Sequence, residues 1–312
     1  MEYPRNIIEF EKMFSSEKQC EEYLISLRWP NGFICPSCQH TEYWILSRHR
    51  IGCKKCKYKF SITSNIIFEQ SNKPLSFWYR AIWLMVAPKN GISALDLQRL
   101  MGFGSYQTSW SWLHKLRKLT VLPDREMLKG QIEVDETYLG GKKKGKRGGG
   151  AEGKIPVIIA VEIMSKGTGR VKISTLPDVT RKSLKGFIDA NIEKGSELIT
   201  DGWESYKKIV GYNHTISYDT IIDDDEEILP NAHRVASLLK RWLLGTHQQY
   251  IAGGKTQNYL DEFTFRYNRR KSISRGLLFH RVMEQAAKHE PIMYSKISES
   301  HTGRKKYAGG KK

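Results

Sequence analysis

Hydrophobic residues in the first 120 positions recur mostly at helical spacing, which predicts a helical N-terminal region. Apolar positions between residues 7 and 28 predict two helices, and Ser15 or Ser16 can cap the second. A cysteine within this pattern, Cys20, is interpreted as a core residue. Apolar stretches interrupted by Pro or Gly predict three further helices, at 75–87, 93–102 and 105–120.

From about residue 126 the pattern changes to short strands and amphipathic helices. Strands are predicted at 132–139, 155–164, 170–179, 196–202 and 214–219. Helices are predicted at 181–192, 204–210 and 232–245, and within YLDEFTFRYNRR (259–270). Three successive strands followed by alternation of helix and strand predict a mixed α/β sheet. This succession resembles a ribonuclease H-like domain.

The charge balance adds a partner to this picture. The chain has 51 Lys and Arg against 33 Asp and Glu, a net charge of +18, which indicates binding to nucleic acid. The N-terminus lacks the apolar segment of a secretory signal, and the longest apolar run, 81–87, is far below the roughly 20 residues that span a bilayer. The protein is therefore expected to be soluble and cytoplasmic, and its cysteines to serve metal or core roles.

Two C-x-x-C pairs lie in the N-terminal third. They are Cys35 with Cys38 and Cys53 with Cys56, separated by a segment that predicts two short strands. Four thiolates in two pairs can close a tetrahedral zinc site, which predicts a zinc ribbon. A redox function is the alternative, but a redox pair would not need the second pair.

The helices predicted at 93–102 and 105–120 are joined by a glycine-containing turn, which resembles a helix-turn-helix. The second would be the recognition helix, and its Trp110 and Trp112 are assigned to the core. The residues it would offer to DNA are Gln107, Thr108, His114, Lys115 and Arg117.

Asp135 stands in the first predicted strand of the α/β region. Strand alternation places it on a polar face with Glu133 and Thr137. The opposite face carries Ile132, Val134 and Glu136. A glycine-rich basic loop follows, and its candidate DNA-contacting residues are Lys142, Lys143, Lys144, Lys146 and Arg147. The alternative is a solvated strand end with a charged hairpin.

A second acid, Asp201, ends a predicted strand 66 positions later. If the two strands are neighbours, Asp135 and Asp201 can face each other and share divalent metal. Taken alone, Asp201 before Gly202 is typical of an ordinary turn.

Together these motifs resemble the insertion-sequence transposases of the DDE superfamily that carry an N-terminal zinc ribbon. The matching segments, within about residues 10–285, are CPSC, CKKC, VDETYLGGK, TDGW, HRVASLLKRWLLGTH and YLDEFTFRYNRR. The resemblance implies that Asp135 and Asp201 are the first two catalytic acids. The third member of such a centre is Glu or Asn, occasionally His, seven residues before a Lys, and counting back from Lys240 gives His233.

His233 departs from the commoner residues at the third position. Helical geometry places it on one face with Ser237 and Lys240, so Lys240 can hold a phosphate beside it. Imidazole brings no negative charge to magnesium, so Asn231 and Glu262 are kept as alternatives.

The resemblance implies a DNA transposase that cleaves and joins insertion-sequence ends with magnesium or manganese bound by Asp135 and Asp201. It also implies a structural zinc ion, recognition of terminal inverted repeats in double-stranded DNA, binding of target DNA, and a homo-oligomer. Further candidate phosphate contacts are Arg241, Arg266, Arg269 and Arg270. The alternatives are a catalytically decayed, non-enzymatic DNA-binding protein on the same scaffold and a metal-dependent nuclease.

These features predict four regions. Residues 1–63 form an N-terminal helix plus zinc ribbon, and 64–125 form a helical, helix-turn-helix-like DNA-binding region. Residues 126–290 form a ribonuclease H-like catalytic domain, and 291–312 form a basic tail that is expected to be disordered.

Overall fold

The computed structural model of the chain divides into two compact units. The helical unit comprises Met1–Leu122 and Lys271–Lys312, and the sheet unit comprises Pro123–Arg270. The predicted catalytic region, 126–290, thus extends beyond the sheet unit into the helical unit. The residues that the structure describes are 2–47, 49–122, 126–140, 154–207, 209–217, 228–248 and 254–298.

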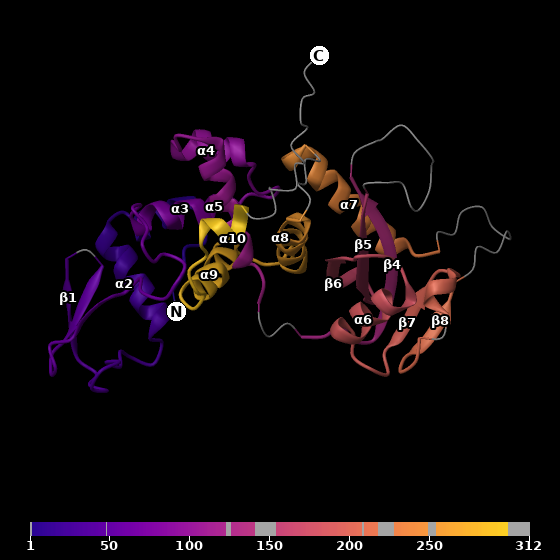
Figure 1. Ribbon diagram of the computed structural model, residues 1–312, viewed down its shortest axis with the longest axis horizontal. Helices are drawn as coiled ribbons and strands as arrows, with labels where there is room; N and C mark the ends of the chain where they lie inside the picture. The colour runs from indigo at the N-terminus through magenta and orange to yellow at the C-terminus, as the bar shows by residue number, and fades with distance from the viewer. Residues whose placement is uncertain are drawn as a thin grey trace, which may run out of the picture. The chain divides into compact units, whose positions relative to one another are not determined.

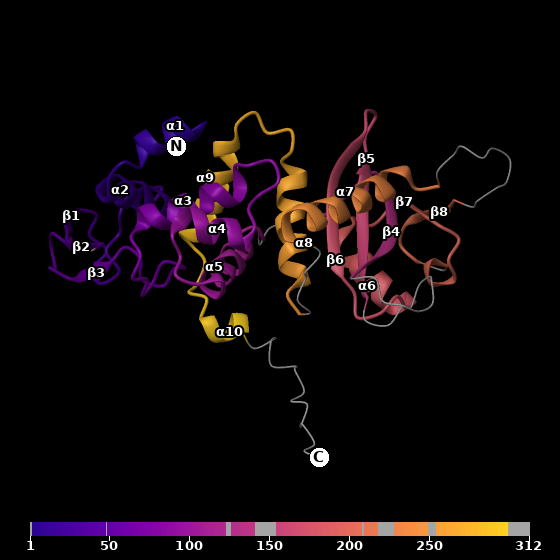
Figure 2. The ribbon, with the colours of Figure 1, turned by 90° about the horizontal axis from the view of Figure 1, so that it is seen from above.

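The helical unit contains the predicted N-terminal helices and two from the C-terminal end of the chain (Figure 2). A capping box at Ser16 begins the second helix, and left-handed Gly102, with φ of +63°, ends the fourth. Part of the segment expected to be disordered is helical, whereas residues 299–312 lie outside the described residues. The helices are α1 (Ile7–Met13), α2 (Glu17–Arg28), α3 (Leu75–Val86), α4 (Ala94–Met101), α5 (Tyr106–Lys118), α9 (Arg275–Ala286) and α10 (Tyr294–Ser298).

An aromatic cluster forms the centre of the helical unit. Phe279 on α9 lies 5.4 Å from Phe10, 5.6 Å from Phe14 and 5.8 Å from Trp83, measured between ring centroids. Such ring pairs contribute stabilisation beyond the area they bury. The start of the chain and α9 therefore share one core. Cys20 on α2 is fully buried, as predicted.

A small antiparallel sheet in the helical unit carries the cysteine pairs. Its strands are β1 (Tyr43–Leu46), β2 (Arg50–Cys53) and β3 (Lys59–Ser61), in that order. The two strands predicted between the cysteine pairs are confirmed, and β3 adds a third.

The sheet unit is built on a mixed five-stranded sheet of order β6-β5-β4-β7-β8 (Figure 1). Antiparallel pairs join β4 to β5 and β5 to β6, whereas β7 pairs in parallel with both β4 and β8. This confirms the predicted mixed sheet. The strands are β4 (Gln131–Leu139), β5 (Ile155–Ile163), β6 (Thr168–Thr175), β7 (Glu197–Thr200) and β8 (Asn213–Ile216).

Helices cover both faces of this sheet: α6 (Arg181–Asn191), α7 (Pro230–His247) and α8 (Thr256–Asn268). Val157, Ile159 and Val161 of β5 pack in one cluster with residues of α7 and α8. The alternating residues Ile158 and Ala160 pack with α6 on the opposite face. Because both faces are buried, the ends of the strands are the places where polar groups can gather.

One predicted helix is wrong. In the segment 204–210, the described residues, which exclude 208, contain a single 3₁₀ turn, η1 (Glu204–Tyr206), after which Lys207 has extended backbone with φ of −62° and ψ of 140°. Tyr206 is fully buried, and Ile209 also packs in the α6-side cluster. Burial of these two side chains from a short extended segment outweighs the helical preference of the sequence. Among the described helices, none has the length and apolar composition needed to cross a membrane.

Candidate active site and metal centres

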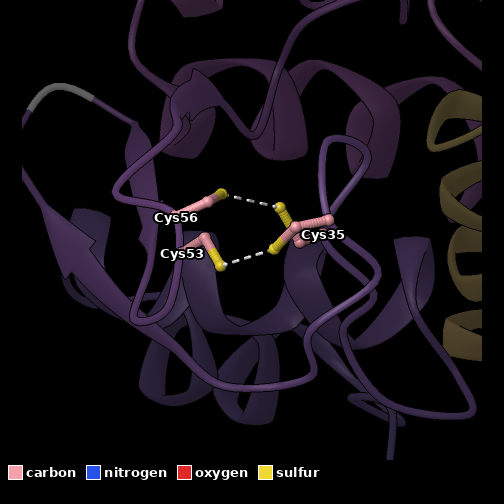
Figure 3. Close-up of side chains that lie close together, drawn as sticks. Cys35, Cys53 and Cys56 are labelled. Carbon is pink, nitrogen blue, oxygen red and sulfur yellow. Dashed lines mark hydrogen bonds between the residues drawn. The ribbon is translucent and has the colours of Figure 1, made fainter.

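The four paired cysteines converge in the helical unit. Their sulfur atoms lie within 4.8 Å of one another, with Cys35 Sγ 3.7 Å from Cys56 Sγ and Cys38 Sγ 3.6 Å from Cys53 Sγ. Figure 3 shows the side chains of Cys53 and Cys56 pointing toward Cys35 across the space between the two turns. Zinc–sulfur bonds of about 2.3 Å in a tetrahedron place the sulfurs about 3.8 Å apart, so the cluster fits zinc.

Both cysteine pairs sit on turns of the same geometry. The Cys35 amide donates to the His40 carbonyl at 2.9 Å, and the Cys53 amide donates to the Tyr58 carbonyl at 3.0 Å. In each turn the residue after the second cysteine, Gln39 or Lys57, has φ of 60°. Two matching turns that present thiols to one point are typical of a structural zinc site.

The surroundings of the four thiols alter their pKa values. The nearby histidines lie outside the cysteine cluster. A backbone hydrogen bond at Tyr58 is the main cause that lowers the pKa of Cys56 to about 6, which favours the thiolate that zinc binds. His49 Nδ1 lies 2.7 Å from Glu21 Oε1, and His40 Nε2 lies 3.7 Å from Glu42 Oε2. The predicted four-cysteine set is therefore complete without imidazole.

Asp135 and Asp201 meet where β7 ends. In the β4–β7 pairing Gln131 lies opposite Glu197 and Glu133 opposite Ile199, and the same offset of 66 positions aligns Asp135 with Asp201. Their carboxylates join that of Glu136 in a group whose ligand atoms lie within 4.8 Å of one another. The predicted proximity of the two aspartates is confirmed, and Glu136 is an addition.

Sequence reasoning missed Glu136 because strand alternation places it on the face opposite Asp135. That alternation holds, since Ile132 and Val134 pack toward α6. However, β7 pairs with β4 only as far as Glu133, so in the part of the chain that the structure describes this side of β4 is unpaired beyond that residue. Side chains from both faces can then reach around the strand edge to Asp201.

Burial and mutual repulsion alter the acidity of this group. Burial is the main cause that raises the pKa of Asp135 to about 6, and the nearby His233 and Lys240 oppose the rise. Burial likewise raises the pKa of Glu136 to about 7, with Asp135 and Asp201 adding to it. Crowded, desolvated carboxylates are relieved by a divalent cation, so the group fits magnesium or manganese.

Helix α7 places His233 beside Asp135. His233 Nε2 lies 3.5 Å from Asp135 Oδ2, while 43% of the histidine side chain is exposed. Ala232, Val235 and Leu239 are buried against the sheet, which leaves His233 and Lys240 on the exposed side of the helix.

The start of α7 is fixed to β4 by Glu133. This carboxylate is 4% exposed and accepts a hydrogen bond of 2.8 Å from the Ala232 amide and one of 2.7 Å from Asn231 Nδ2. No side chain of the helix's own N-terminal segment caps α7, and Pro230 occupies its first turn. Glu133 therefore supplies the cap and determines where His233 lies relative to Asp135.

The two alternatives for the third catalytic residue lie differently. Asn231 directs its amide group to Glu133, and Glu262 is fully buried on α8. Glu262 lies outside the group of Asp135, Glu136 and Asp201, and so does His233, although it contacts Asp135.

Some of the predicted DNA-contacting residues are exposed. Gln107 and Thr108 lie in the first turn of α5, where Gln107 Nε2 donates to the Tyr294 hydroxyl at 3.0 Å. Lys240 and Arg241 lie on the exposed side of α7. All four residues are accessible to a DNA backbone.

Other predicted DNA-contacting residues are buried or committed to the fold. His114 and Arg117 are each 1% exposed, and burial lowers the pKa of Lys115. Arg266 is 7% exposed. DNA could reach His114, Arg117 and Arg266 only after the surrounding chain rearranged, whereas Lys115 is half-buried.

Two arginines fasten the end of α8. Arg270 donates to the backbone carbonyls of Thr168 and Gly169 at the start of β6, and it stacks 4.1 Å from the Tyr267 ring. Arg269 lies 4.2 Å from the Phe265 ring. Positive charge at a helix C-terminus and contacts between a guanidinium and an aromatic ring both stabilise a fold. The observed contacts of Arg269 and Arg270 are therefore structural. The predicted loop residues Lys142, Lys143, Lys144, Lys146 and Arg147 lie outside the described residues.

The region of the carboxylate group and the region of the four cysteines each match a known protein family. Residues 127–268 match the ISXO2-like transposase domain, and residues 15–59 match the transposase zinc-ribbon domain. An "uncharacterized protein in transposable element ISH50" of Halobacterium salinarum is 24% identical over 282 residues, which cover 82% of this chain and 92% of the halobacterial protein. The first match contains Asp135, Asp201 and His233, and the second contains all four clustered cysteines.

Proposed function

Because the chain belongs to the zinc-ribbon insertion-sequence transposases of the DDE superfamily, we propose that it cleaves DNA at the ends of an insertion sequence and joins those ends to target DNA. One observation carries this proposal: Asp135 and Asp201 converge at the end of β7, with His233 beside them. Two partly buried carboxylates that lie together are suited to metal-dependent phosphoryl transfer.

The proposed fold of the catalytic domain is ribonuclease H-like. Three antiparallel strands followed by two parallel strands, in the order β6-β5-β4-β7-β8, support it. The proposed acids lie on the central strand and just after its parallel neighbour, where ligands commonly bind in open α/β sheets.

Asp135 and Asp201 would hold magnesium or manganese, which when bound activates the attacking oxygen and stabilises the leaving one. His233 lies close enough to Asp135 to complete the centre. Lys240, two turns along the same helix, would bind a DNA phosphate. The pairing of Glu133 with α7 keeps these groups in register with Asp135.

The proposed reaction has two steps, hydrolysis and strand transfer. Water attacks a phosphorus atom at the element's end, and the bond to the 3′ oxygen breaks to leave a 3′-OH and a 5′-phosphate. That 3′-OH then attacks a phosphorus of target DNA, forming a new phosphodiester and releasing a target 3′-OH. Each proton passes from the attacking oxygen to solvent or a neighbouring base.

DNA recognition is assigned to the helical unit. The zinc ribbon and the α4–α5 pair, read as a helix-turn-helix, would bind the terminal inverted repeats, with Gln107 and Thr108 entering a groove. Lys240 and Arg241 would contact phosphates near the catalytic centre. Bringing two ends together requires a homo-oligomer.

The experiment is metal-dependent nicking and strand transfer on DNA carrying the element's ends. Asp135→Ala should abolish both activities and leave binding to the terminal repeats largely intact. Loss in His233→Ala as well would place histidine in the centre. A wild type that binds the repeats but never cleaves would instead favour the non-enzymatic DNA-binding alternative.

A further inference from the structure

We propose that Glu136 is a third carboxylate ligand of the catalytic metal centre and that Tyr206 is the residue that positions it. The inference rests on the proposed function, because it concerns the same metal centre. It assigns a metal-binding role to Glu136, which strand alternation places on the face of β4 opposite Asp135.

The open edge of β4 makes this role feasible. Among the described residues, none pairs with the β7-facing side of β4 beyond Glu133, while the other side remains paired with β5 to Leu139. Asp135 approaches this edge from the α7 face and Glu136 from the α6 face. Their ligand atoms, with that of Asp201, all lie within 4.8 Å of one another.

Tyr206 holds Glu136 in this position. Tyr206 is 0% exposed and packs in the α6-side core. Its hydroxyl donates a hydrogen bond to Glu136 Oε2 at 2.6 Å. A carboxylate accepts about four hydrogen bonds or ligand contacts through two oxygens, so this bond leaves capacity for a metal. A rigid buried phenol is suited to orienting a ligand from behind.

The turn that contains Tyr206 also orients Asp201. The Trp203 amide donates to Asp201 Oδ1 at 3.1 Å, and the Tyr206 amide donates to the Trp203 carbonyl at 3.0 Å. One short segment, Asp201 to Tyr206, therefore fixes two of the three carboxylates.

Charge supports a third acid at this place. Two aspartates bring two negative charges to the proposed metal centre, and an imidazole brings none. Magnesium and manganese prefer oxygen ligands, and His233 adds none. Glu136 supplies the further negative charge that α7 does not.

The test measures manganese binding to the full-length, zinc-loaded chain without DNA, by the concentration dependence of the unfolding temperature and by the electron paramagnetic resonance of unbound Mn²⁺. Glu136→Gln removes the charge, and Tyr206→Phe removes only the hydroxyl. Matched controls are Glu197→Gln, at the start of β7, and Tyr212→Phe, whose hydroxyl donates to Asp189 instead.

We expect Glu136→Gln to weaken manganese binding at least tenfold and Tyr206→Phe to weaken it several-fold, with both controls unchanged. The double variant should bind as weakly as Glu136→Gln alone, because Tyr206 acts through Glu136. Binding by Glu136→Gln within twofold of the wild type would overturn the inference, as would a wild type with no manganese-dependent shift.

The proposed function can fail separately. If Asp135→Ala loses manganese binding and nicking whereas Glu136→Gln keeps both, the inference fails and the transposase proposal stands. If the wild type shows no metal-dependent nicking while Glu136→Gln still weakens manganese binding, the metal site stands without the proposed activity.

Discussion

Asp135 belongs to the proposed metal centre, and burial raises its pKa from the usual 3.8 to about 6. A carboxyl group whose pKa is raised by folding stabilises the folded state while protonated. That contribution is complete below pH 4 and is lost as the pH rises through about 6, at a cost of about 2–3 kcal/mol. Glu136, with its pKa near 7, extends the window upward.

We therefore predict that zinc-loaded protein without magnesium or manganese becomes less stable between pH 5 and pH 8, and that Asp135→Asn reduces this loss. The measurement is the free energy of unfolding in denaturant, with the zinc site filled and no magnesium or manganese added. Asp189→Asn is the control, because Lys185 lowers the pKa of Asp189 and its titration ends below this window. Equal pH dependence in wild type and Asp135→Asn would contradict the assigned burial effect.

A second prediction at residue scale concerns zinc. Cys53→Ser should remove one tetrahedral ligand and release zinc, since the β1–β3 sheet is small and metal binding supplies much of its folding free energy. Metal analysis of purified protein checks this. Cys20→Ser is the matched control, because Cys20 is buried on α2 outside the four-thiol group, and it should retain zinc.

Groups of residues that are defined by their spacing could be predicted from the sequence. Two C-x-x-C pairs identify four ligands without a structure, and the offset of 66 positions between Asp135 and Asp201 matches the strand register. Glu136 could not be predicted, because its position depends on where the partner strand stops. Strand length is set by tertiary packing, which local alternation does not encode.

At the scale of elements, the start of α7 depends on Glu133. We predict that Glu133→Ala costs about 1–3 kcal/mol of stability, because it removes the helix cap and leaves the Ala232 amide buried without its carboxylate. Asn231→Ala loses only the second hydrogen bond and should cost less. Denaturant unfolding ranks the two, and a larger cost for Asn231→Ala would refute the cap assignment.

The exposed side of α7 also carries a prediction about DNA. Arg241→Ala should weaken binding to element DNA of any sequence and reduce the slope of log affinity against log salt by about 1. Lys194→Ala is the control, since Lys194 lies exposed before the N-terminal end of β7, away from Asp201. Affinity measured over a range of salt concentrations distinguishes them. An unchanged slope in Arg241→Ala would exclude a phosphate contact.

Basic residues on helices were the least predictable group. Arg117, Arg266 and Arg270 look like phosphate contacts in the sequence, yet two are nearly buried and Arg270 binds carbonyls of β6. Helical periodicity identifies the polar side of a helix, but it does not show whether another element of the fold buries that side. Gln107 and Thr108 remain exposed because they occupy the first turn of α5.

At the scale of the whole molecule, the chain leaves the helical unit at Leu122 and returns to it at Lys271. The sheet unit is thus an insertion between α5 and α9. The sequence analysis predicted a continuous catalytic region to residue 290, and the family resemblance extends to about residue 285. Only the contacts of Phe279 with aromatic residues of α1 and α3 reveal where α9 belongs.

This arrangement predicts that the start and end of the chain fold together. Phe279→Ala should cost the helical unit about 3–5 kcal/mol, because a fully buried ring with several aromatic neighbours leaves a cavity. A fragment of residues 1–122 should unfold at a lower temperature than the same fragment joined by a flexible linker to residues 271–298. Circular dichroism during heating measures both effects. If residues 1–122 alone were as stable as the joined fragment, α9 would be dispensable for the core, and the N-terminal helices would fold independently of the C-terminal end.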